Sequence, residues 1–313
     1  MPTSSLLAPK TVRNAQNAPM LSVPPAGPGM IHSHIAVDVE FPLHFQLNGE
    51  RTDRPIDVFH THNLLEIGLC LTGAGIFHVG GKVLPFQAGD VSVLTPLEWH
   101  RSQSARGTIC TWAWFFFDPA RLLVPAFTRT LPYAPEDFAG PGFANVMRGA
   151  DHPELVVLLQ ELVREGHAKA DGYRDNMRAL LLMLLQRLRR RFTVKPAAPP
   201  AAATRETPSR VLPALDAMAR RYHESLGINE LARQCGMSVR TFQLHFRRAM
   251  GQTPQSYLIQ CRVQAAIALL RTSELSVTDL AFECGFGSLS SFNRAFRTHT
   301  GRKPSAFRKG EAP

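Results

Sequence analysis

The stretch at residues 280–296, LAFECGFGSLSSFNRAF, repeats an earlier one at residues 231–246, LARQCGMSVRTFQLHF, with one residue inserted. The repeat continues past both stretches, where Arg247 matches Arg297, Gly251 matches Gly301 and Pro254 matches Pro304. So many matches in one order indicate a duplicated unit, with copies at about 228–249 and 277–299.

Each copy predicts two helices joined by a tight turn. Gly236 and Gly285 supply the left-handed residue that ends the first helix, and Ser238 and Ser288 cap the second. A pair of phenylalanines at i and i+4 anchors the second helix in a core. This is the pattern of a helix-turn-helix, whose second helix enters the major groove of DNA.

With these phenylalanines in the core, the helical period places a polar face on the other side of each second helix. The exposed side chains are Arg240, Gln243, Leu244 and Arg247 in the first copy, and Ser290, Asn293, Arg294 and Arg297 in the second. Arginine recognises guanine, asparagine and glutamine recognise adenine, and serine recognises either. A solvated face would explain one such helix, but two of them favour DNA recognition. Leu244 occupies a place that suits a polar residue, which weakens the prediction for the first copy.

The charge of the chain is concentrated in the same region. From Arg210 onward there are 15 Lys and Arg against 7 Asp and Glu, whereas the first 209 residues hold 20 against 18. Of the net charge of +10, +8 therefore belongs to the last third of the chain. A basic module behind a nearly neutral one indicates a polyanionic partner.

Two further helices complete this all-α domain, which we place at residues 210–309. Residues 254–271 predict one helix of about 27 Å, close to the roughly 34 Å between successive major-groove faces. An amphipathic helix precedes both copies. Its apolar side chains are Val211, Leu212, Leu215, Met218, Ala219 and Tyr222.

Residues 210–308 resemble the DNA-binding domain of the AraC/XylS family of bacterial transcription regulators. The resemblance is carried by Leu280-Ala281-x-x-Cys284-Gly285-Phe286, Ser291-Phe292-x-x-Ala295-Phe296 and Gly301-x-x-Pro304-Ser305-x-Phe307-Arg308. It implies binding to double-stranded promoter DNA and activation of transcription through contact with RNA polymerase. It also implies an N-terminal barrel that binds a small-molecule effector.

The first part of the chain fits such a barrel, so the expected fold class is multidomain α+β. Residues 30–118 show short apolar runs broken by glycine turns, at 64–71, 75–79 and 91–94, typical of a small β-sandwich or barrel. Gly80-Gly81 is expected to form a hairpin turn. Together these patterns predict a cupin-like barrel.

Residues 119–192 change to a helical pattern with two apolar stripes. The stripes are Leu155, Leu158, Leu159, Leu162 and Val163, then Met177, Leu180, Leu181, Leu184, Leu185 and Leu188. They suit either packing on the barrel or a relay and dimer contact in a homodimer. Residues 193–209 are a Pro/Ala linker, and residues 1–29 are expected to form a flexible arm.

Four titratable residues of the barrel resemble the cupin motifs: His60, His62 and Glu66, followed by His100. On one strand, residues 60, 62 and 66 would face the same side, with His100 approaching from a neighbouring strand. Arg54 occupies a position where the first cupin motif has glycine. The spacing before His100 is one residue shorter than in the second cupin motif. We therefore favour an effector pocket without catalytic residues or cofactor. The alternative is a site for iron, manganese or zinc.

The sequence thus predicts a DNA-binding transcription regulator, an activator controlled by an effector, and not an enzyme. Five scattered cysteines indicate no disulfide framework, and without a long apolar run or signal segment we expect a cytoplasmic protein without membrane contact. Two alternatives remain open. One is a cupin-type metalloenzyme, and the other is a constitutive DNA-binding regulator with a degenerate barrel.

Overall fold

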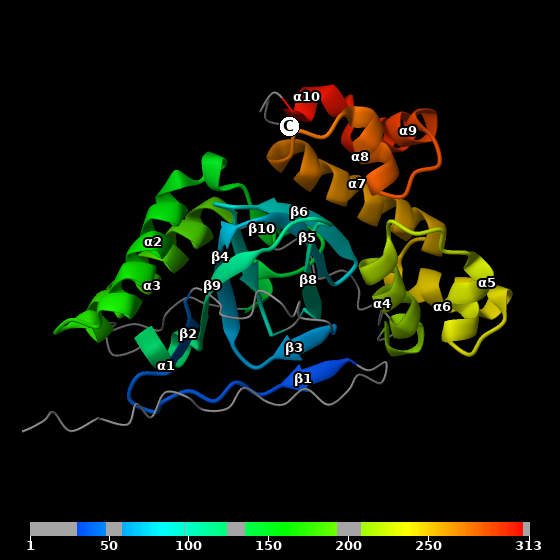
Figure 1. The fold of residues 1–313 in the computed structure, drawn as a ribbon. Coiled ribbons are helices and arrows are strands. Elements are labelled where there is room, and N and C mark those ends of the chain that lie inside the picture. The colour runs from blue at the N-terminus through cyan, green and yellow to red at the C-terminus, as the bar shows by residue number, and fades with distance from the viewer. Residues whose placement is uncertain (1–29, 48–57, 97, 124–134, 193–207, 309–313) are drawn as a thin grey trace, which may run out of the picture.

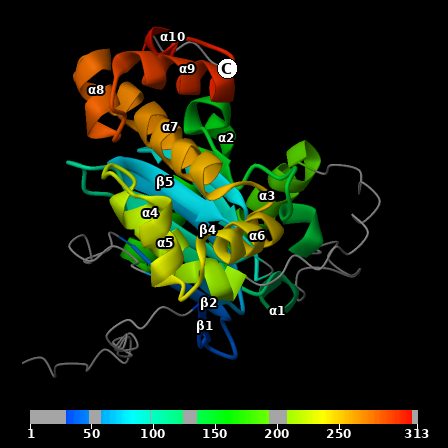
Figure 2. The same cartoon turned by 90° about the vertical axis from the view of Figure 1, so that its right-hand side faces the viewer.

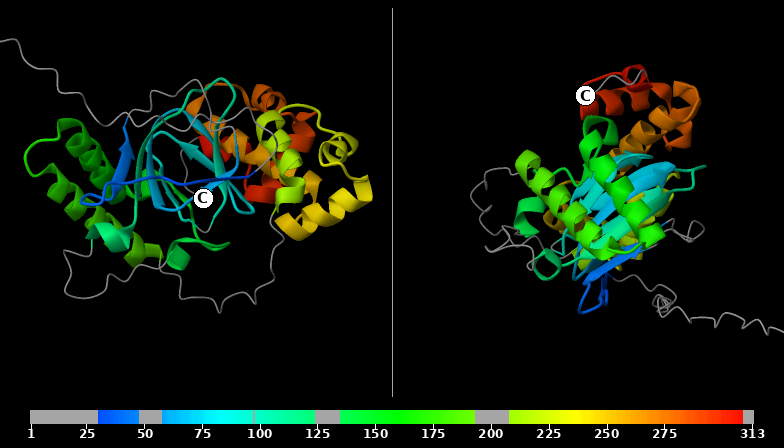
Figure 3. Two further views of the ribbon diagram at one scale, coloured as in Figure 1. Left: turned by 90° about the horizontal axis from the view of Figure 1, so that it is seen from below. Right: turned by 90° about the vertical axis from the view of Figure 1, so that its left-hand side faces the viewer.

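The computed structural model describes residues 30–47, 58–96, 98–123, 135–192 and 208–308 of the 313-residue chain. Two β-sheets lie in the middle, with a helical pair on one side and the C-terminal helices on the other (Figure 1; Figure 3). The expected arm at 1–29 lies outside the described residues. So does most of the expected linker, whose last two residues belong to the 3-10 turn η4 (Pro208–Val211).

The N-terminal part is built from two five-stranded sheets. The first has the order β1 (Ile31–Ser33), β3 (His60–His62), β8 (His100–Ser104), β5 (Ala74–Val79), β6 (Lys82–Gln87). The second has the order β10 (Val146–Met147), β7 (Val91–Leu94), β4 (Leu65–Thr72), β9 (Thr111–Phe117), β2 (Leu43–Gln46). The predicted sheet domain is confirmed, as two sheets rather than a closed barrel. Strand β10 extends it beyond residue 118.

Two glycines form a hairpin turn in the first sheet, and a proline lies in its edge strand. Gly80 and Gly81 form the turn of the β5–β6 hairpin, and Gly80 has φ +54°. Strand β6 is the last strand of its sheet and contains Pro85, which lacks the N–H that a central strand would donate. The predicted hairpin is therefore confirmed.

Helices α2 (Pro153–Ala168) and α3 (Tyr173–Phe192) pack against each other and against the second sheet. They are preceded by the short elements α1 (Pro119–Leu123), η2 (Pro135–Phe138) and η3 (Gly149–Asp151). Both apolar stripes join one core with strands β4, β7 and β9, and Leu159, Leu181 and Leu184 are fully buried. Of the two alternatives for the stripes, the structure shows packing on the chain's own sheet.

The C-terminal domain is entirely helical. After η4 it contains α4 (Leu212–Arg221), α5 (Ile228–Gln234), α6 (Val239–Met250), α7 (Pro254–Thr272), α8 (Val277–Glu283), α9 (Leu289–Thr300) and α10 (Pro304–Arg308). The pairs α5–α6 and α8–α9 are the two predicted helix-turn-helix units. Ser238 and Ser288 cap α6 and α9 by accepting hydrogen bonds from the backbone N–H of Thr241 and Ser291. Among the described residues, no helix is both long and apolar enough to cross a lipid bilayer.

The two turn glycines have unequal surroundings, which gives a first prediction. Gly236 has φ +65° with open space around it, whereas a Cβ on Gly285, at φ +83°, would lie 2.7 Å from the backbone oxygen of His223. Gly236→Ala should lower the free energy of unfolding by about 1–2 kcal/mol, which is the cost of the left-handed conformation for a residue with a Cβ. Gly285→Ala should lower the free energy of unfolding further, because a backbone atom cannot move aside cheaply. Urea unfolding of both variants measures the difference, and equal losses would contradict this account.

Helix α7 joins the two halves of the molecule by lying across β5 and β6 (Figure 2). One continuous core includes Phe59, Ile76, Val83 and Ala105 of the sheet domain together with the helices of the C-terminal domain. Nearly all sides of α7 are therefore buried, including the run 265–270. A helix that is apolar all round requires burial on more than one side.

Candidate nucleic-acid interface and a buried histidine cluster

Helix α6 presents the first predicted DNA-reading face. Phe242 and Phe246 are fully buried, and α6 packs against η4, α5 and α7. Their burial turns the opposite face outward. The exposed side chains on it are Arg240, Gln243, Leu244 and Arg247, with Leu244 50% exposed. The geometry is that of a helix whose apolar side is fixed and whose polar side is free to enter a groove.

Helix α9 repeats this arrangement in the second unit. Phe292 and Phe296 are fully buried. Ser290, Arg294 and Arg297 are exposed, and Asn293 is half-buried. A surface pocket of about 330 Å³ is lined by Asn293, Arg294, Arg297 and Thr298, so three of the predicted residues share one surface.

Helix α7 spaces the two faces. It runs from the end of the first unit to the start of the second and packs against both α6 and α9 (Figure 1). Its 19 residues span about 28 Å. Thr253 caps its N-terminus, and Tyr257 packs edge-on against Phe246. A rigid spacer of this length suits two helices that read successive turns of a duplex.

The sheet domain brings together the four residues His60, His62, Glu66 and His100. His60 and His62 belong to β3, Glu66 belongs to β4 in the other sheet, and His100 is the β8 residue paired with His60. The expectation that residues 60, 62 and 66 share one strand is therefore wrong. The chain passes from one sheet to the other between β3 and β4, and that corner brings Glu66 to the histidines. The approach of His100 from a neighbouring strand is confirmed.

The four side chains contact one another closely. Glu66 Oε2 lies 2.7 Å from His62 Nε2 and 3.6 Å from His100 Nε2. The His60 and His100 rings have centroids 4.3 Å apart. One nitrogen or oxygen from each residue lies within 4.8 Å of one from every other. His62, Glu66 and His100 are at most 4% exposed.

Burial and mutual contact set the charges of this cluster. Burial favours the neutral form of Glu66, but its contacts with His100 and His62 outweigh burial, so the pKa of the carboxyl is lowered and Glu66 is ionised. Burial, assisted by the nearby His100, lowers the pKa of His60 to about 3. An ionised carboxylate therefore lies next to a neutral imidazole in an environment almost without water.

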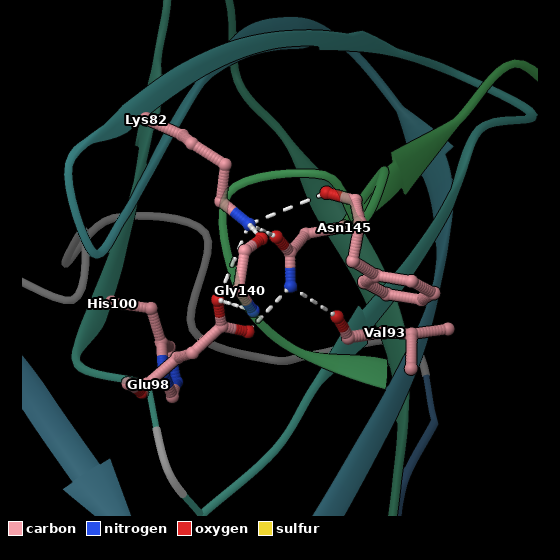
Figure 4. Close-up of polar contacts among 7 residues, drawn as sticks. Lys82, Val93, Glu98, His100, Gly140 and Asn145 are labelled. Atoms are coloured by element: carbon pink, nitrogen blue, oxygen red, sulfur yellow. Dashed lines mark hydrogen bonds and ion pairs between the residues drawn. The ribbon is translucent and has the colours of Figure 1, made fainter. Parts of the chain in front are cut away.

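A buried polar network lies beside the cluster (Figure 4). The Lys82 ammonium donates to the Glu98 carboxylate at 3.2 Å, to the Gly140 carbonyl at 2.8 Å and to the side-chain oxygen of Asn145. Asn145, which is fully buried, donates to Glu98 at 2.8 Å and to the Val93 carbonyl at 3.0 Å. This network fastens the segment before β10 to both sheets. Sequence reasoning missed it, because the partners are up to 63 residues apart.

Polar contacts bridge the sheet domain and the C-terminal domain. The Tyr257 hydroxyl of α7 lies 2.7 Å from His78 Nδ1 of β5, and both residues are fully buried. Arg101 of β8, 1% exposed, donates to Asp216 of α4 at 2.7 Å. Burial, with the nearby Arg101 charge, lowers the pKa of His78 to about 3. These contacts were not predicted, although the excess of apolar residues on α7 was a signal for a second packing partner.

Comparisons with known proteins agree with both halves of this structure. The family model of the AraC-like ligand binding domain matches residues 48–185, and that of a helix-turn-helix domain matches residues 231–310. The first match includes strands β3 to β10, α2 and most of α3, and the second runs from within α5 past the end of α10. The chain belongs to the AraC/XylS family of transcription regulators, and its function is DNA-binding regulation of transcription.

Individual proteins are similar to this chain over part or most of its length. The HTH-type transcriptional activator RhaS of Escherichia coli O1:K1 is 25% identical over 80% of this chain and 87% of its own length. RhaS of Klebsiella pneumoniae (strain 342) is 42% identical over 26% of this chain and 29% of its own length. A solved structure of the DNA-binding domain of AdpA with a target DNA is 36% identical, covers 31% of this chain and 91% of that chain, and has a TM-score of 0.30.

Proposed function

We propose that this protein activates transcription by reading promoter DNA with α6 and α9 in tandem, under the control of a small-molecule effector bound in the sheet domain. The observation that carries the proposal is the pair of outward faces on α6 and α9, each fixed by two buried phenylalanines. Arg240, Gln243 and Arg247 read bases from α6. Ser290, Asn293, Arg294 and Arg297 do so from α9. Leu244, exposed on α6, suits an apolar contact with a thymine methyl group.

A direct route connects the two domains for such control. In β8, His100 faces the histidine cluster, and the next residue, Arg101, contacts Asp216 of the C-terminal domain. Successive residues of a strand face opposite sides of the sheet. A ligand that shifts β8 from the cluster side would therefore alter the contact on the other side. Such a ligand acts through its different affinities for the docked and undocked arrangements.

The partners follow from this function. RNA polymerase is the proposed protein partner, the active form is a homodimer, and the bacterial cytoplasm is where it meets promoter DNA. Because the leucine stripes are buried in the chain's own core, a dimer contact on α2 and α3 would use outward side chains. Exposed apolar ones include Val157 and Met183, 53% and 46% exposed.

Arg294→Ala tests the DNA-reading assignment. A target site is first selected from random DNA with the purified full-length protein at a stated salt concentration, because phosphate contacts make affinity salt-dependent. Affinities of wild type and variant are then compared on all single-base variants of that site. We expect a loss of about 1–3 kcal/mol of discrimination at one base position.

The control for this test is Arg164→Ala, which removes the same charge from an exposed position on α2. It should leave the base preferences unchanged. A loss with Arg294→Ala that is uniform across all sequences would instead make Arg294 a phosphate contact. If no preferred site is recovered at all, tandem base reading is wrong.

A further inference from the structure

The orientation of the three histidine rings in the cluster is fixed by the backbone. Nδ1 of His60 lies 3.2 Å from the Val58 carbonyl, Nδ1 of His62 lies 2.9 Å from the Leu64 carbonyl, and Nδ1 of His100 lies 3.0 Å from the Glu98 carbonyl. A carbonyl oxygen only accepts, so each Nδ1 carries the proton and donates it. In the neutral form of each ring the lone pair is therefore on Nε2.

This arrangement places electron-pair donors against one another. Nε2 of His62 faces the Glu66 carboxylate at 2.7 Å. Nε2 of His100, in a residue 2% exposed, has no hydrogen-bond partner among the described residues. A proton between His62 and Glu66 would satisfy that one pair and leave the nitrogen of His100 unsatisfied. A single cation among the four side chains satisfies all of them.

The donor set and its dimensions identify the kind of cation. Three imidazoles and one carboxylate suit first-row transition metals rather than calcium or magnesium, which prefer oxygen ligands. At metal–ligand distances of about 2.1 Å, ligand atoms on opposite sides of an ion are about 4.2 Å apart. The four ligand atoms, all within 4.8 Å of one another, reach that spacing with shifts of about half an ångström. Histidine ligands characteristically donate their other ring N–H to a carbonyl or carboxylate, as all three do.

We propose that the sheet domain binds one divalent first-row transition-metal ion through Nε2 of His60, His62 and His100 and the carboxylate of Glu66. The four side chains already contact one another, so an organic molecule has no room between them. The inference deepens the proposed function by naming the class of ligand that this part of the effector domain takes.

The test is a titration of the full-length, chelator-treated protein with Co(II), followed by displacement with Zn(II). Visible absorption bands of Co(II) report its coordination, and equilibrium dialysis gives the stoichiometry. We expect one ion per chain, no thiolate charge-transfer absorption, and displacement by one equivalent of Zn(II). Glu66→Gln and His62→Gln should each weaken metal binding by at least about tenfold. Loss of a residue that only hydrogen-bonds to a metal ligand already weakens binding by that much, and Glu66 and His62 are proposed as ligands themselves.

The matched control is His44→Gln, because His44 is a half-buried histidine of β2 outside the cluster. It should bind Co(II) as the wild type does. Circular dichroism and DNA affinity show whether each variant is folded. The wild type alone also decides the question, since failure to bind Co(II), Zn(II), Mn(II) or Fe(II) at one per chain overturns the inference. Equal affinity of wild type and Glu66→Gln, or thiolate absorption, overturns it as well.

Failure of this inference is distinguishable from failure of the proposed function. If the protein binds no metal ion but reads a specific DNA sequence, the metal site is wrong and the proposed function stands. The reverse result, one bound ion without sequence preference, keeps the metal site and removes the DNA-reading assignment.

Discussion

Asp216→Ala should release the C-terminal helices from the sheet domain. The substitution removes the carboxylate that faces the Arg101 guanidinium, a charge that is 1% exposed. Breaking a buried ion pair from one side costs about 3–5 kcal/mol. Because undocking returns Arg101 to water, the chain can avoid this cost by separating its domains rather than by unfolding. The equilibrium constant for docking of the C-terminal domain on the sheet domain should therefore fall by more than about a hundredfold.

Small-angle X-ray scattering of the full-length protein measures this change as an increase in the radius of gyration. Glu283→Ala is the matched control, since it breaks another ion pair between the domains, Arg106–Glu283, whose side chains are 58% and 42% exposed. Exposed pairs contribute about 0–1 kcal/mol, so this variant should scatter like the wild type. An unchanged radius for Asp216→Ala would mean that apolar packing of α7 alone holds the domains together.

Lys82→Met should lower the free energy of unfolding of the sheet domain by about 3 kcal/mol. Lys82 compensates the buried Glu98 carboxylate and donates to two carbonyl groups of the segment 140–143. Its removal leaves Glu98 with the neutral donors Asn145 and the N–H of Gly140. These stabilise a charge less than an ammonium does.

Chemical unfolding followed by circular dichroism measures this loss. The double variant Lys82→Met, Glu98→Gln should recover part of the stability, because it removes the buried charge along with its partner. Lys303→Met, at an exposed position, should change stability by no more than about 0.5 kcal/mol. If Lys303→Met costs as much as Lys82→Met, the buried network is not the cause.

Docking also bears on how regulation works. The side chains proposed to read DNA remain outward while α7 is packed on β5 and β6. The sheet domain therefore leaves the reading faces of α6 and α9 uncovered, and its contacts are with α7, α4 and α8. Undocking by Asp216→Ala would accordingly leave the accessibility of α6 and α9 unchanged.

The outward faces of α6 and α9 were predictable from the sequence. Glycine, serine and phenylalanine at fixed spacings specify local conformation and one buried face, and these determine which side chains of α6 and α9 point outward. The histidine cluster was only half predictable. The sequence identified His60, His62, Glu66 and His100 but placed three of them on one strand. The corner between β3 and β4 carries no sequence signal that distinguishes it from a continuous strand.

The sequence by itself determined the helix-turn-helix repeat, the strand-rich first domain and the leucine-rich helices, because each follows from short-range periodicity and turn residues. Only the tertiary structure decided how these parts meet. The Arg101–Asp216 contact joins residues 115 positions apart, and His78–Tyr257 joins residues 179 apart. Pairings at such separations depend on which surfaces exclude water together. For α7, buried on nearly every side, the second surface is the sheet of β5 and β6.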